Sequence, residues 1–363
     1  MTLTSLEGLE RLREDLKKID VEIVGLLNRR AEISAQIGRI KEEKRMDIYD
    51  PAQEARVYEN LKKANEGSMP AASLKAIFRE IVSASRSLQK PITVAYLGPE
   101  ASFSHLAAQS HFGTSTRFSP QATIFRVFDE VERGKVQWGV VPMENSLEGS
   151  VNLTLDRLIA TPLRIRAEIF LRISYCLLSI TDKMDAIASV YSHPHALAQC
   201  QGWLRVNLPH CGLIGVESTA AAAKKILKDG AGAAIASRLA VVRYGLHILS
   251  EGIEDNPANT TRFLVIGEGE SRMTGADKTT ILFGTPHTPG SLYHALEPFA
   301  ARQLNLVKIE SYPTKEKIWE YLFFVDVAGH EDDEKLRKCL EDLKKKTTFL
   351  KIVGSYPRGE GAL

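Results

Sequence analysis

The 363-residue sequence predicts a multidomain protein in which an all-helical region, an α/β region and a smaller α+β region follow one another. Three observations support this. Residues 1–90 carry apolar side chains at helical spacing and no strand-like run, residues 91–270 alternate short apolar runs with amphipathic segments, and residues 278–358 read strand, helix, strand, strand, helix, strand. With 44% hydrophobic residues, a chain of this length can fill several cores.

One long helix, predicted from about residue 5 to 44, dominates the first region. Apolar residues recur there at spacings of three and four, as in a heptad seam: Leu9, Leu12, Leu16, Ile19, Ile23, Leu26, Ile33, Ile37 and Ile40. The helix would be roughly 60 Å long. Two shorter helices, predicted at 51–65 and 70–89, cannot cover it, so we expect a second copy of the chain to complete this core.

Arg30 occupies the seam position between Leu26 and Ile33. A guanidinium keeps its charge, so a buried Arg30 needs a carboxylate of the protein or a bound anion as its partner. The residue could instead fix the register of a coiled coil, or extend its charged end to water. The spacing alone leaves these roles open.

The middle region alternates predicted strands with predicted helices. The strands cover residues 92–97, 138–142, 188–191, 212–216 and 263–266, and the helices cover 104–111, 123–133, 150–160, 196–206 and 219–228. This alternation predicts a mostly parallel sheet, whose ligands bind beyond the carboxyl ends of the strands. Polar motifs stand at those ends, at 98–104, 142–146, 192–195 and 217–220. Each precedes a helix and could be an ordinary cap, but four together indicate an anion-binding site.

Composition argues against several classes of protein. Lys plus Arg (47) and Asp plus Glu (45) leave a net charge of +2, which does not favour nucleic-acid binding. No run approaches the roughly 18 apolar residues of a membrane span, and residues 1–14 are amphipathic rather than signal-like, so we expect a cytoplasmic protein. The four cysteines form no CxxC pair, and the Cys and His residues between 193 and 211 match no common zinc spacing. We predict free thiols, no metal and no cofactor.

The C-terminal region has the element order of the split βαβ arrangement found in ferredoxin-like domains. Its strands are predicted at 279–284, 306–311, 318–327 and 350–355, and its helices at 291–303 and 332–345. No nucleophile, metal cluster or phosphate loop is visible in this stretch, so we expect a structural or regulatory role.

Five motifs of the middle region carry a resemblance to a known family: AYLGPEASFSHLAA (95–108), VVPMENSLEGSV (140–151), SHPHALAQC (192–200), ESTAAAA (217–223) and NTTRF (259–263). The helical region adds Arg13, Asp20, Arg29, Arg30, Lys41, IYDP (48–51), Glu54 and SASRSLQ (83–89). On these residues the chain resembles the bifunctional chorismate mutases/prephenate dehydratases of phenylalanine biosynthesis. The resemblance implies an all-helical mutase domain at 1–90, a two-lobed dehydratase domain of the periplasmic-binding-protein type at 91–270, and an ACT regulatory domain at 278–358.

Chorismate is a dianion that rearranges to prephenate through a pericyclic transition state without proton transfer, so the mutase needs fixed charges and donors rather than a nucleophile. The resemblance implies that Arg13 and Arg30 bind the two carboxylates and that Lys41 and Gln89 face the ether oxygen. It also implies contacts to the hydroxyl and ring from Asp50, Glu54 and Ser85. Arg13 would come from the other subunit. Gln53 stands where the family usually has an arginine, so a weak or merely structural mutase domain is the alternative.

Dehydration of prephenate expels CO₂ and a hydroxide, which needs a proton or strong hydrogen bonds. The resemblance makes Thr261 the hydroxyl beside that leaving group. A threonine is too weak an acid to donate a full proton unaided, so we expect it to hydrogen-bond, or to relay a proton from water or Glu144. The other implied site residues are Asn145, Ser192, Gln199, Arg262 and Phe263, with Ser102, Ser104, Ser218 and Thr219 binding carboxylates at helix N-termini.

The ACT resemblance implies a phenylalanine sensor. Its binding segments would be Gly290, Ser291, Leu292 and Tyr293, and Glu310, Ser311, Tyr312 and Pro313. Tyr312 replaces the arginine usual in the family, which bears on effector affinity and identity. Such ligands commonly sit between two subunits, so inhibition would require a homodimer or higher oligomer. A non-catalytic amino-acid sensor is the alternative from another class.

Overall fold

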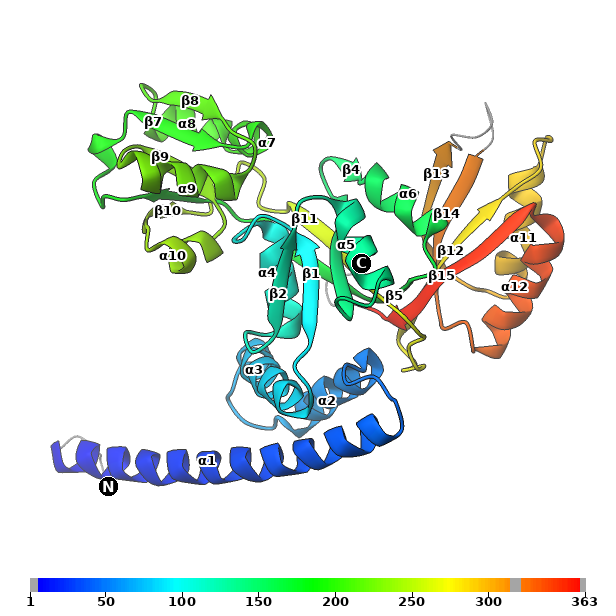
Figure 1. Cartoon of the computed structure of the whole chain (residues 1–363), viewed down its shortest axis with the longest axis horizontal. Helices are drawn as coiled ribbons and strands as arrows, with labels where there is room; N and C mark the ends of the chain where they lie inside the picture. The colour runs from blue at the N-terminus through cyan, green and yellow to red at the C-terminus, as the bar shows by residue number, and fades with distance from the viewer. Residues whose placement is uncertain (1–5, 314–320, 360–363) are drawn as a thin grey trace. The chain divides into compact units, whose positions relative to one another are not determined.

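A computed structural model describes residues 6–313 and 321–359 of the chain (Figure 1). The chain forms two compact units. The first contains the residues up to Asp50 together with Leu61–Ile92 and Phe112–Arg117, and the second contains Pro51–Asn60, Thr93–His111 and the residues from Phe118 onward.

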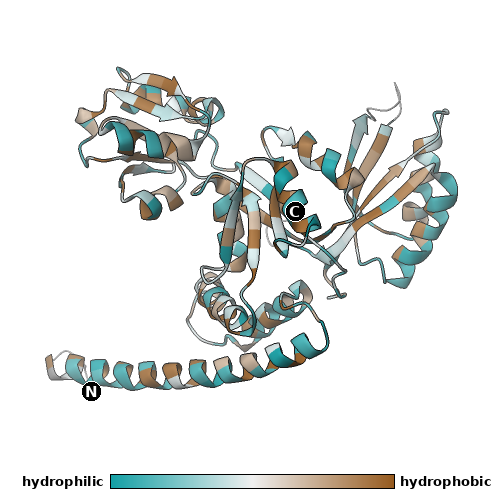
Figure 2. Cartoon of the chain, viewed as in Figure 1, coloured by the Kyte–Doolittle hydropathy of each residue, from teal (hydrophilic) through white to brown (hydrophobic). Residues whose placement is uncertain are grey.

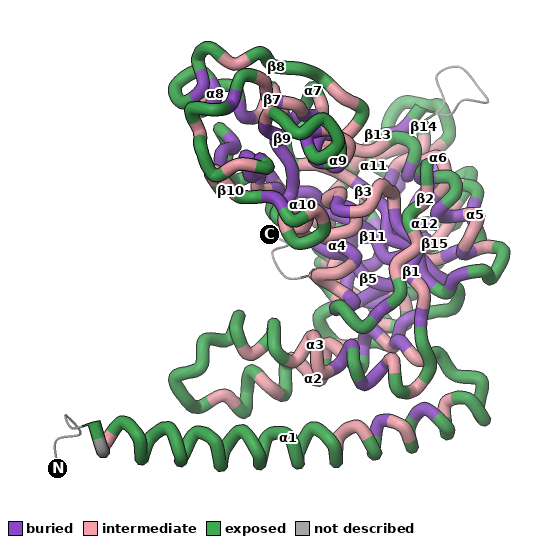
Figure 3. The backbone as a smooth tube through the Cα atoms, turned by 60° about the vertical axis from the view of Figure 1, so that its left-hand side comes forward, coloured by how far each residue is buried: buried purple, intermediate pink, exposed green. Residues whose placement is uncertain are grey.

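Three helices follow one another in the N-terminal region, as predicted: α1 (Leu6–Glu43), α2 (Pro51–Ala64) and α3 (Ala71–Gln89). Helix α1 packs on α3 only near its C-terminal end, where Ser34 and Gly38 are buried (Figure 3). A Cβ on Gly38 would lie 2.8 Å from the Cβ of Gln89, so this close approach of the two helices requires glycine.

The apolar seam of α1 is exposed along its length. All nine seam residues are between 44% and 66% exposed, from Leu9 at 44% to Leu26 at 66%. Figure 2 shows hydrophobic positions recurring along α1 among hydrophilic ones. Each seam side chain therefore keeps about half of its surface exposed in a single chain.

The middle region begins with a six-stranded sheet, which we call the large lobe. Its strands, in spatial order, are β2 (Arg117–Gln121), β1 (Thr93–Leu97), β3 (Trp138–Asn145), β11 (Thr260–Gly267) and β5 (Arg164–Arg172), with β4 (Gly149–Ser150) paired to β3. Its helices are α4 (Phe103–Phe112), α5 (Ile124–Glu132) and α6 (Asn152–Ala160). Strand β11 runs antiparallel to both β3 and β5. The predicted mostly parallel sheet was therefore wrong here.

After β5 the chain forms a second sheet, the small lobe, and then returns through β11. The small-lobe strands, in spatial order, are β10 (His247–Glu251), β6 (Cys176–Ser179), β9 (Ala233–Ala236), β7 (Ser189–Ser192) and β8 (Gly212–Gly215). Its helical segments are η1 (Met184–Ala186), α7 (Pro194–Gln199), α8 (Gln201–Asn207), α9 (Thr219–Asp229) and α10 (Leu239–Tyr244). This exit and return confirms the predicted two-lobed organisation.

The C-terminal region has the predicted order of elements. It comprises β12 (Asp277–Gly284), α11 (Ser291–Ala301), β13 (Leu306–Pro313), β14 (Tyr321–Ala328), α12 (Glu334–Lys346) and β15 (Phe349–Pro357). The strands form an antiparallel sheet in the order β13-β14-β12-β15, which we call the C-terminal sheet. Residues 318–320 of the predicted strand 318–327 lie outside the described residues.

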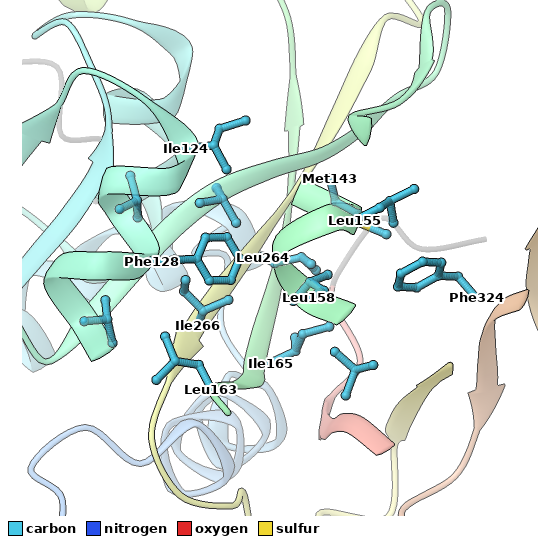
Figure 4. Close-up of a cluster of buried hydrophobic side chains, with 14 of the residues drawn as sticks. Ile124, Phe128, Met143, Leu155, Leu158, Leu163, Ile165, Leu264, Ile266 and Phe324 are labelled. Atoms are coloured by element: carbon cyan, nitrogen blue, oxygen red, sulfur yellow. The ribbon is translucent and has the colours of Figure 1, made fainter. Parts of the chain in front are cut away.

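The two faces of the C-terminal sheet belong to different cores. On one face, Phe283 and Val325 pack with α11 and α12. On the other, Phe324 and Tyr356 join the core of the large lobe, and Figure 4 shows Phe324 among its side chains. A Cβ on Gly354 of β15 would collide with the Ile165 backbone of β5, so this glycine lets the two strands approach closely. The large lobe and the C-terminal sheet thus share one hydrophobic core.

No described helix combines the length and the apolar character needed to cross a membrane. All four cysteines are free thiols, and three of them are buried. Across residues 6–313 and 321–359, no group of three His, Cys, Asp or Glu side chains is arranged to hold a metal ion.

Candidate active sites

The first candidate site lies where β3 and β11 pair at one end. Asn145, the last residue of β3, stands opposite Thr261, the second residue of β11. The Asn145 amide donates a 2.8 Å hydrogen bond from Nδ2 to Thr261 Oγ1. Antiparallel pairing thus joins two predicted site residues that are 116 positions apart in the sequence.

Two backbone groups fix the polarity of this pair. Asn145 Oδ1 accepts from the N–H of Leu147 at 2.9 Å and from that of Glu148 at 3.2 Å. A backbone N–H can only donate, so the amide oxygen must face these groups and the amide NH₂ must face Thr261. Thr261 Oγ1 is therefore an acceptor toward Asn145, and its own proton can be donated to a substrate.

The hydrogen-bond network continues onto the small lobe. Asn145 Nδ2 also donates to Asn259 Oδ1 at 2.8 Å, and Asn259 Nδ2 donates to Gln199 Oε1 at 2.9 Å. Gln199, the last residue of α7, donates from Nε2 to Glu148 Oε1 at 3.1 Å, and the same oxygen lies 2.8 Å from His195 Nδ1. Residues from both lobes therefore meet in one polar network, and the sequence predicted three of its members.

Sequence reasoning missed the other members. Asn259, Glu148 and His195 lie inside three of the family-like motifs, so their place in those motifs was the available signal. Tyr175 donates to Gln199 Oε1 at 3.0 Å but lies outside every motif. Only the tertiary structure identifies it as part of the site.

Glu144 and Arg262 lie on the opposite face of the same two strands. They stand opposite each other in the register, one step from the pair formed by Asn145 and Thr261, and successive side chains of a strand point to opposite faces. Arg262 Nη1 lies 3.0 Å from Glu144 Oε1. Two expectations are corrected: Glu144 is not placed to relay a proton to Thr261, and the Arg262 guanidinium faces carboxylates of the protein rather than the site.

The pKa shifts on this face support the conclusion that Glu144 is not a proton donor. Burial raises the pKa of Glu144, but ion pairs with Lys308 and Arg262 outweigh burial and hold this pKa below its usual value. Burial likewise opposes ionisation of Asp326, yet Arg262 holds the pKa of Asp326 below its usual value. An ionised Glu144 carries no proton to relay.

The predicted carboxylate-binding hydroxyls do stand at helix starts. Ser102 and Ser218 precede α4 and α9, and each accepts a hydrogen bond from the backbone N–H three residues further on, at 3.3 Å and 3.0 Å. Both are therefore N-caps, and Ser104 and Thr219 lie in the first turns behind them. Their contacts with substrate stay a prediction.

Two further predicted residues are buried. Ser192 is fully buried in β7 and donates to the Ile235 carbonyl at 2.7 Å, so this expected substrate contact is instead a bond within the small lobe. Phe263 is 2% exposed in β11, two residues after Thr261. It belongs to the packed support of the strand.

The second candidate site lies between α1 and α3. Arg30 is half-buried and donates from Nη1 to Ser85 Oγ, which itself donates to the Ile81 carbonyl at 2.7 Å. Burial lowers the pKa of Arg30. Lys41 donates to the Ile48 carbonyl at 2.8 Å. The structure thus joins two of the predicted mutase residues directly, across the helices that carry them.

Gln89 completes this side of the candidate site. Its Oε1 is buried and has no hydrogen-bond partner among the described residues. A buried amide oxygen without a donor is unfavourable in a finished core but expected where a ligand supplies the missing hydrogen bond.

Arg13 lies 17 residues before Arg30 on the same continuous helix and is exposed. At 1.5 Å per residue their Cα atoms are about 25 Å apart. Two guanidinium groups so far apart cannot hold one small dianion, so Arg13 can serve the predicted site only from another chain.

Asp50 is the last residue of the first segment of the first compact unit, whereas Gln53 and Glu54 lie on α2 in the second unit. Glu54 is the acidic residue of the first turn of α2. The joint placement of these three residues with Arg30 stays a prediction.

The predicted effector segments lie at α11 and β13. Gly290 adopts a φ of 81° immediately before α11, and Tyr293 on that helix is 71% exposed. On β13, Glu310 Oε2 accepts from Ser150 Oγ at 2.6 Å, and Tyr312 donates to Asp156 Oδ1 at 2.5 Å. The two β13 side chains therefore face the large lobe, whereas Ser311 and Pro313 are exposed and, with Leu292, stay predicted effector contacts.

Fold and sites together define a class: a multidomain enzyme with a helical domain, a two-lobed α/β domain and a C-terminal ACT domain. Family models match in the same order, as chorismate mutase type II over residues 12–90, prephenate dehydratase over 94–271 and ACT domain over 279–345.

Relatives agree over nearly the whole chain. A bifunctional chorismate mutase/prephenate dehydratase of Aquifex aeolicus is 46% identical, covering 97% of this chain and 99% of the relative, and one of Neisseria gonorrhoeae is 40% identical, covering 98% and 99%. The prephenate dehydratase of Arthrobacter aurescens in complex with L-Phe has a TM-score of 0.68 at 35% identity, covering 74% of this chain and 90% of that one. The chain belongs to the bifunctional chorismate mutase/prephenate dehydratase family and is an enzyme, both an isomerase and a lyase.

Proposed function

We propose that this chain converts chorismate to prephenate at the site between α1 and α3, and prephenate to phenylpyruvate at the site around Thr261. The hydrogen bond from Asn145 to Thr261 is the observation that carries the second assignment, because its fixed polarity presents the threonine proton to a ligand. Purified protein given chorismate should form prephenate and then phenylpyruvate, measured by product absorbance. Formation of neither product would leave the non-catalytic sensor as the better explanation.

In the dehydratase step, loss of the ring carboxylate as CO₂ pushes electrons toward the departing ring hydroxyl. Thr261 donates a hydrogen bond to that hydroxyl as negative charge builds on it, while Asn145 supports the threonine oxygen from behind. The net reaction consumes one proton, and this proton comes from the bulk solvent as the hydroxide leaves as water, because Glu144 is ionised and lies on the other face of the strands.

In the mutase step, the protein supplies fixed charge and hydrogen-bond donors. Arg30, oriented by Ser85, holds one carboxylate, and Gln89 turns its buried amide toward the ether oxygen. The ether oxygen can only accept, so it takes a hydrogen bond from the Gln89 NH₂ group. The buried acceptor Oε1, which lacks a partner in the structure, is then satisfied by a donor such as the hydroxyl of the substrate. These preorganised groups stabilise the charge that develops as the ether bond breaks, without a covalent step.

Gln53→Arg tests whether the mutase site is compromised. We expect kcat/KM for chorismate to rise about tenfold, because one charge-assisted hydrogen bond to the dianion is regained. Gln53→Leu, which removes the amide donor, should lower it. Initial rates of chorismate consumption measure both variants. Equal rates for Gln53→Arg and the parent chain would show that glutamine at position 53 does not weaken the mutase site.

We infer that a second copy of the chain covers the α1 seam. Nine exposed apolar residues in heptad spacing fit another such helix, and Arg13 can reach an Arg30 site only from a partner. The proposed homodimer therefore completes the mutase sites as well as the helical core.

We also infer that the protein is cytoplasmic. The four cysteines are free thiols, as expected in a reducing compartment.

We infer that the ACT domain senses phenylalanine, supported by the relative solved in complex with L-Phe. Phenylalanine should lower the dehydratase rate in a saturable manner, whereas tyrosine should act only at higher concentration. Titration of the rate of phenylpyruvate formation with each amino acid, alongside size-exclusion chromatography, measures this effect. A rate and an oligomeric state that neither amino acid changes would refute the sensor assignment.

A further inference from the structure

A buried cluster of charged side chains joins the dehydratase strands to the C-terminal sheet. At its centre is the Arg262 guanidinium, whose side chain is 4% exposed. Nη1 lies 3.0 Å from Glu144 Oε1 and 2.7 Å from Asp326 Oδ2, and Nη2 donates to the Tyr356 hydroxyl at 2.9 Å. Nε lies 2.9 Å from Glu168 Oε2, an ion pair without hydrogen-bond geometry.

The partners of Arg262 come from two domains. Glu144 on β3 and Glu168 on β5 belong to the large lobe, whereas Asp326 on β14 and Tyr356 on β15 belong to the C-terminal sheet. Asp326 Oδ1 also accepts from Thr280 at 2.6 Å, which fixes the carboxylate inside its own sheet. The orientation of Arg262 is therefore determined in part by a group outside the dehydratase domain.

Arg262 follows Thr261 directly on β11. Because neighbours on a strand share their backbone and point to opposite faces, a rotation of the strand that moves the guanidinium also re-aims the threonine hydroxyl. The register of β11 against β3 shifts immediately after Arg262, and such irregularities change the local twist of a strand. The ion pairs therefore hold the strand beside one of the irregularities in its pairing.

A second contact leads from the same cluster to the predicted effector segment. Lys308 on β13 lies 2.5 Å from Glu144 Oε2 and 3.0 Å from Glu310 Oε2. Glu310, the first residue of the predicted β13 effector segment, also accepts from Ser150 on β4, which pairs with Glu144 in the register. Displacement of Glu310 would therefore change the charge around Lys308 and, through Glu144, around Arg262.

We propose that Arg262 is a positioning residue for the dehydratase, and that Asp326 of the C-terminal sheet sets its orientation and thereby the aim of Thr261. The state of the C-terminal domain then reaches the leaving-group site through charge contacts rather than through a bound ligand at that site. This inference rests on the assignment of Thr261 to the dehydration step.

Asp326→Asn in the full-length chain is the test, because asparagine keeps the shape and can still accept from Thr280 while removing the charge that faces Arg262. We expect kcat for prephenate to fall about tenfold with KM changed less than about twofold, since positioning acts on the transition state rather than on substrate binding. The maximal inhibition by phenylalanine should also decrease. Chorismate mutase activity of the same preparation should be unchanged.

Asp342→Asn is the matched control. Asp342 lies on α12 of the same domain, away from the cluster, and its carboxylate pairs with Arg302 at 2.5 Å. Its replacement should leave kcat for prephenate and the inhibition by phenylalanine unchanged. If Asp326→Asn does not fold, Lys308→Met at the 20% exposed rim of the cluster should give the same pattern with a smaller fall in kcat.

Three results separate the possibilities. A lower melting temperature with kcat and phenylalanine inhibition as in the parent chain would mean that the cluster only joins the domains, and would overturn the inference. A higher KM at unchanged kcat would assign Arg262 to substrate binding and would also overturn it. A parent chain without dehydratase activity, or Thr261→Val with an unchanged rate, would instead refute the underlying assignment.

Discussion

Replacing Thr261 by valine should lower the dehydratase kcat about a thousandfold, at the upper end of the usual range for loss of one positioned hydrogen-bond donor to developing negative charge. Valine has the same shape and remains a good strand residue, so β11 should keep its pairing with Asn145. The loss should appear in kcat rather than in KM, because the hydrogen bond strengthens only as charge builds on the departing hydroxide. Rates of phenylpyruvate formation measure the effect.

Two further variants serve as controls for Thr261→Val. Thr261→Ser retains the hydroxyl and should stay within about tenfold of the parent chain, because only the restraint of the methyl group is lost. Thr260→Ala removes the neighbouring hydroxyl, which donates to the Ala258 carbonyl at 3.3 Å, and should change kcat less than about twofold. Mutase activity of each preparation reports whether the protein is intact. A Thr261→Val variant with more than a tenth of the parent kcat would mean that Thr261 is not the donor.

Replacing Arg30 by alanine should lower kcat/KM for chorismate by about a hundredfold to a thousandfold, because charge-assisted bonds to a carboxylate are lost in a partly desolvated site. Arg30→Lys should lose less, since the charge remains but the paired geometry of the guanidinium does not. Arg29→Ala, at an exposed neighbouring position, is the control. Dehydratase activity should be unchanged in all three, and a mutase rate for Arg30→Ala close to that of the parent chain would remove Arg30 from the site.

Arg30→Ala also tests whether Arg13 of one chain completes the mutase site of the other chain. Neither Arg13→Ala nor Arg30→Ala chains should form a complete mutase site alone, but a mixed dimer contains one site with both arginines. After denaturation and joint refolding of equal amounts, mutase activity should return to roughly a quarter of the parent value. Mixing without recovery would contradict a site shared between two chains.

The sequence predicted best where one pattern runs long. The seam of α1 and the alternation of the C-terminal region are sustained, and both regions have the predicted elements. Strand β5 was missed although Ile165, Ala167 and Ile169 alternate with polar residues, and β9 was missed because an alanine run such as Ala233–Ala236 favours helix.

The wrong expectation for Arg262 has a definite structural cause. The strand predicted to begin at Phe263 begins at Thr260 in the structure, so Thr261 and Arg262 are strand neighbours rather than loop residues. In a loop both side chains could face a substrate, but on a strand only one of them can. Composition and motif spacing do not contain this register, because it depends on pairing with β3 and β5.

Helix α1 also constrains the length of the chain. If Arg13 and Arg30 must meet different copies of the same substrate pocket, the 17-residue separation along the helix fixes the distance between the two pockets. Inserting one residue would turn Arg13 by about 100° relative to Arg30 and move it about 1.5 Å along the axis, whereas replacing one apolar seam residue by another changes neither. This stretch should therefore tolerate exchanges of apolar residues far better than insertions or deletions.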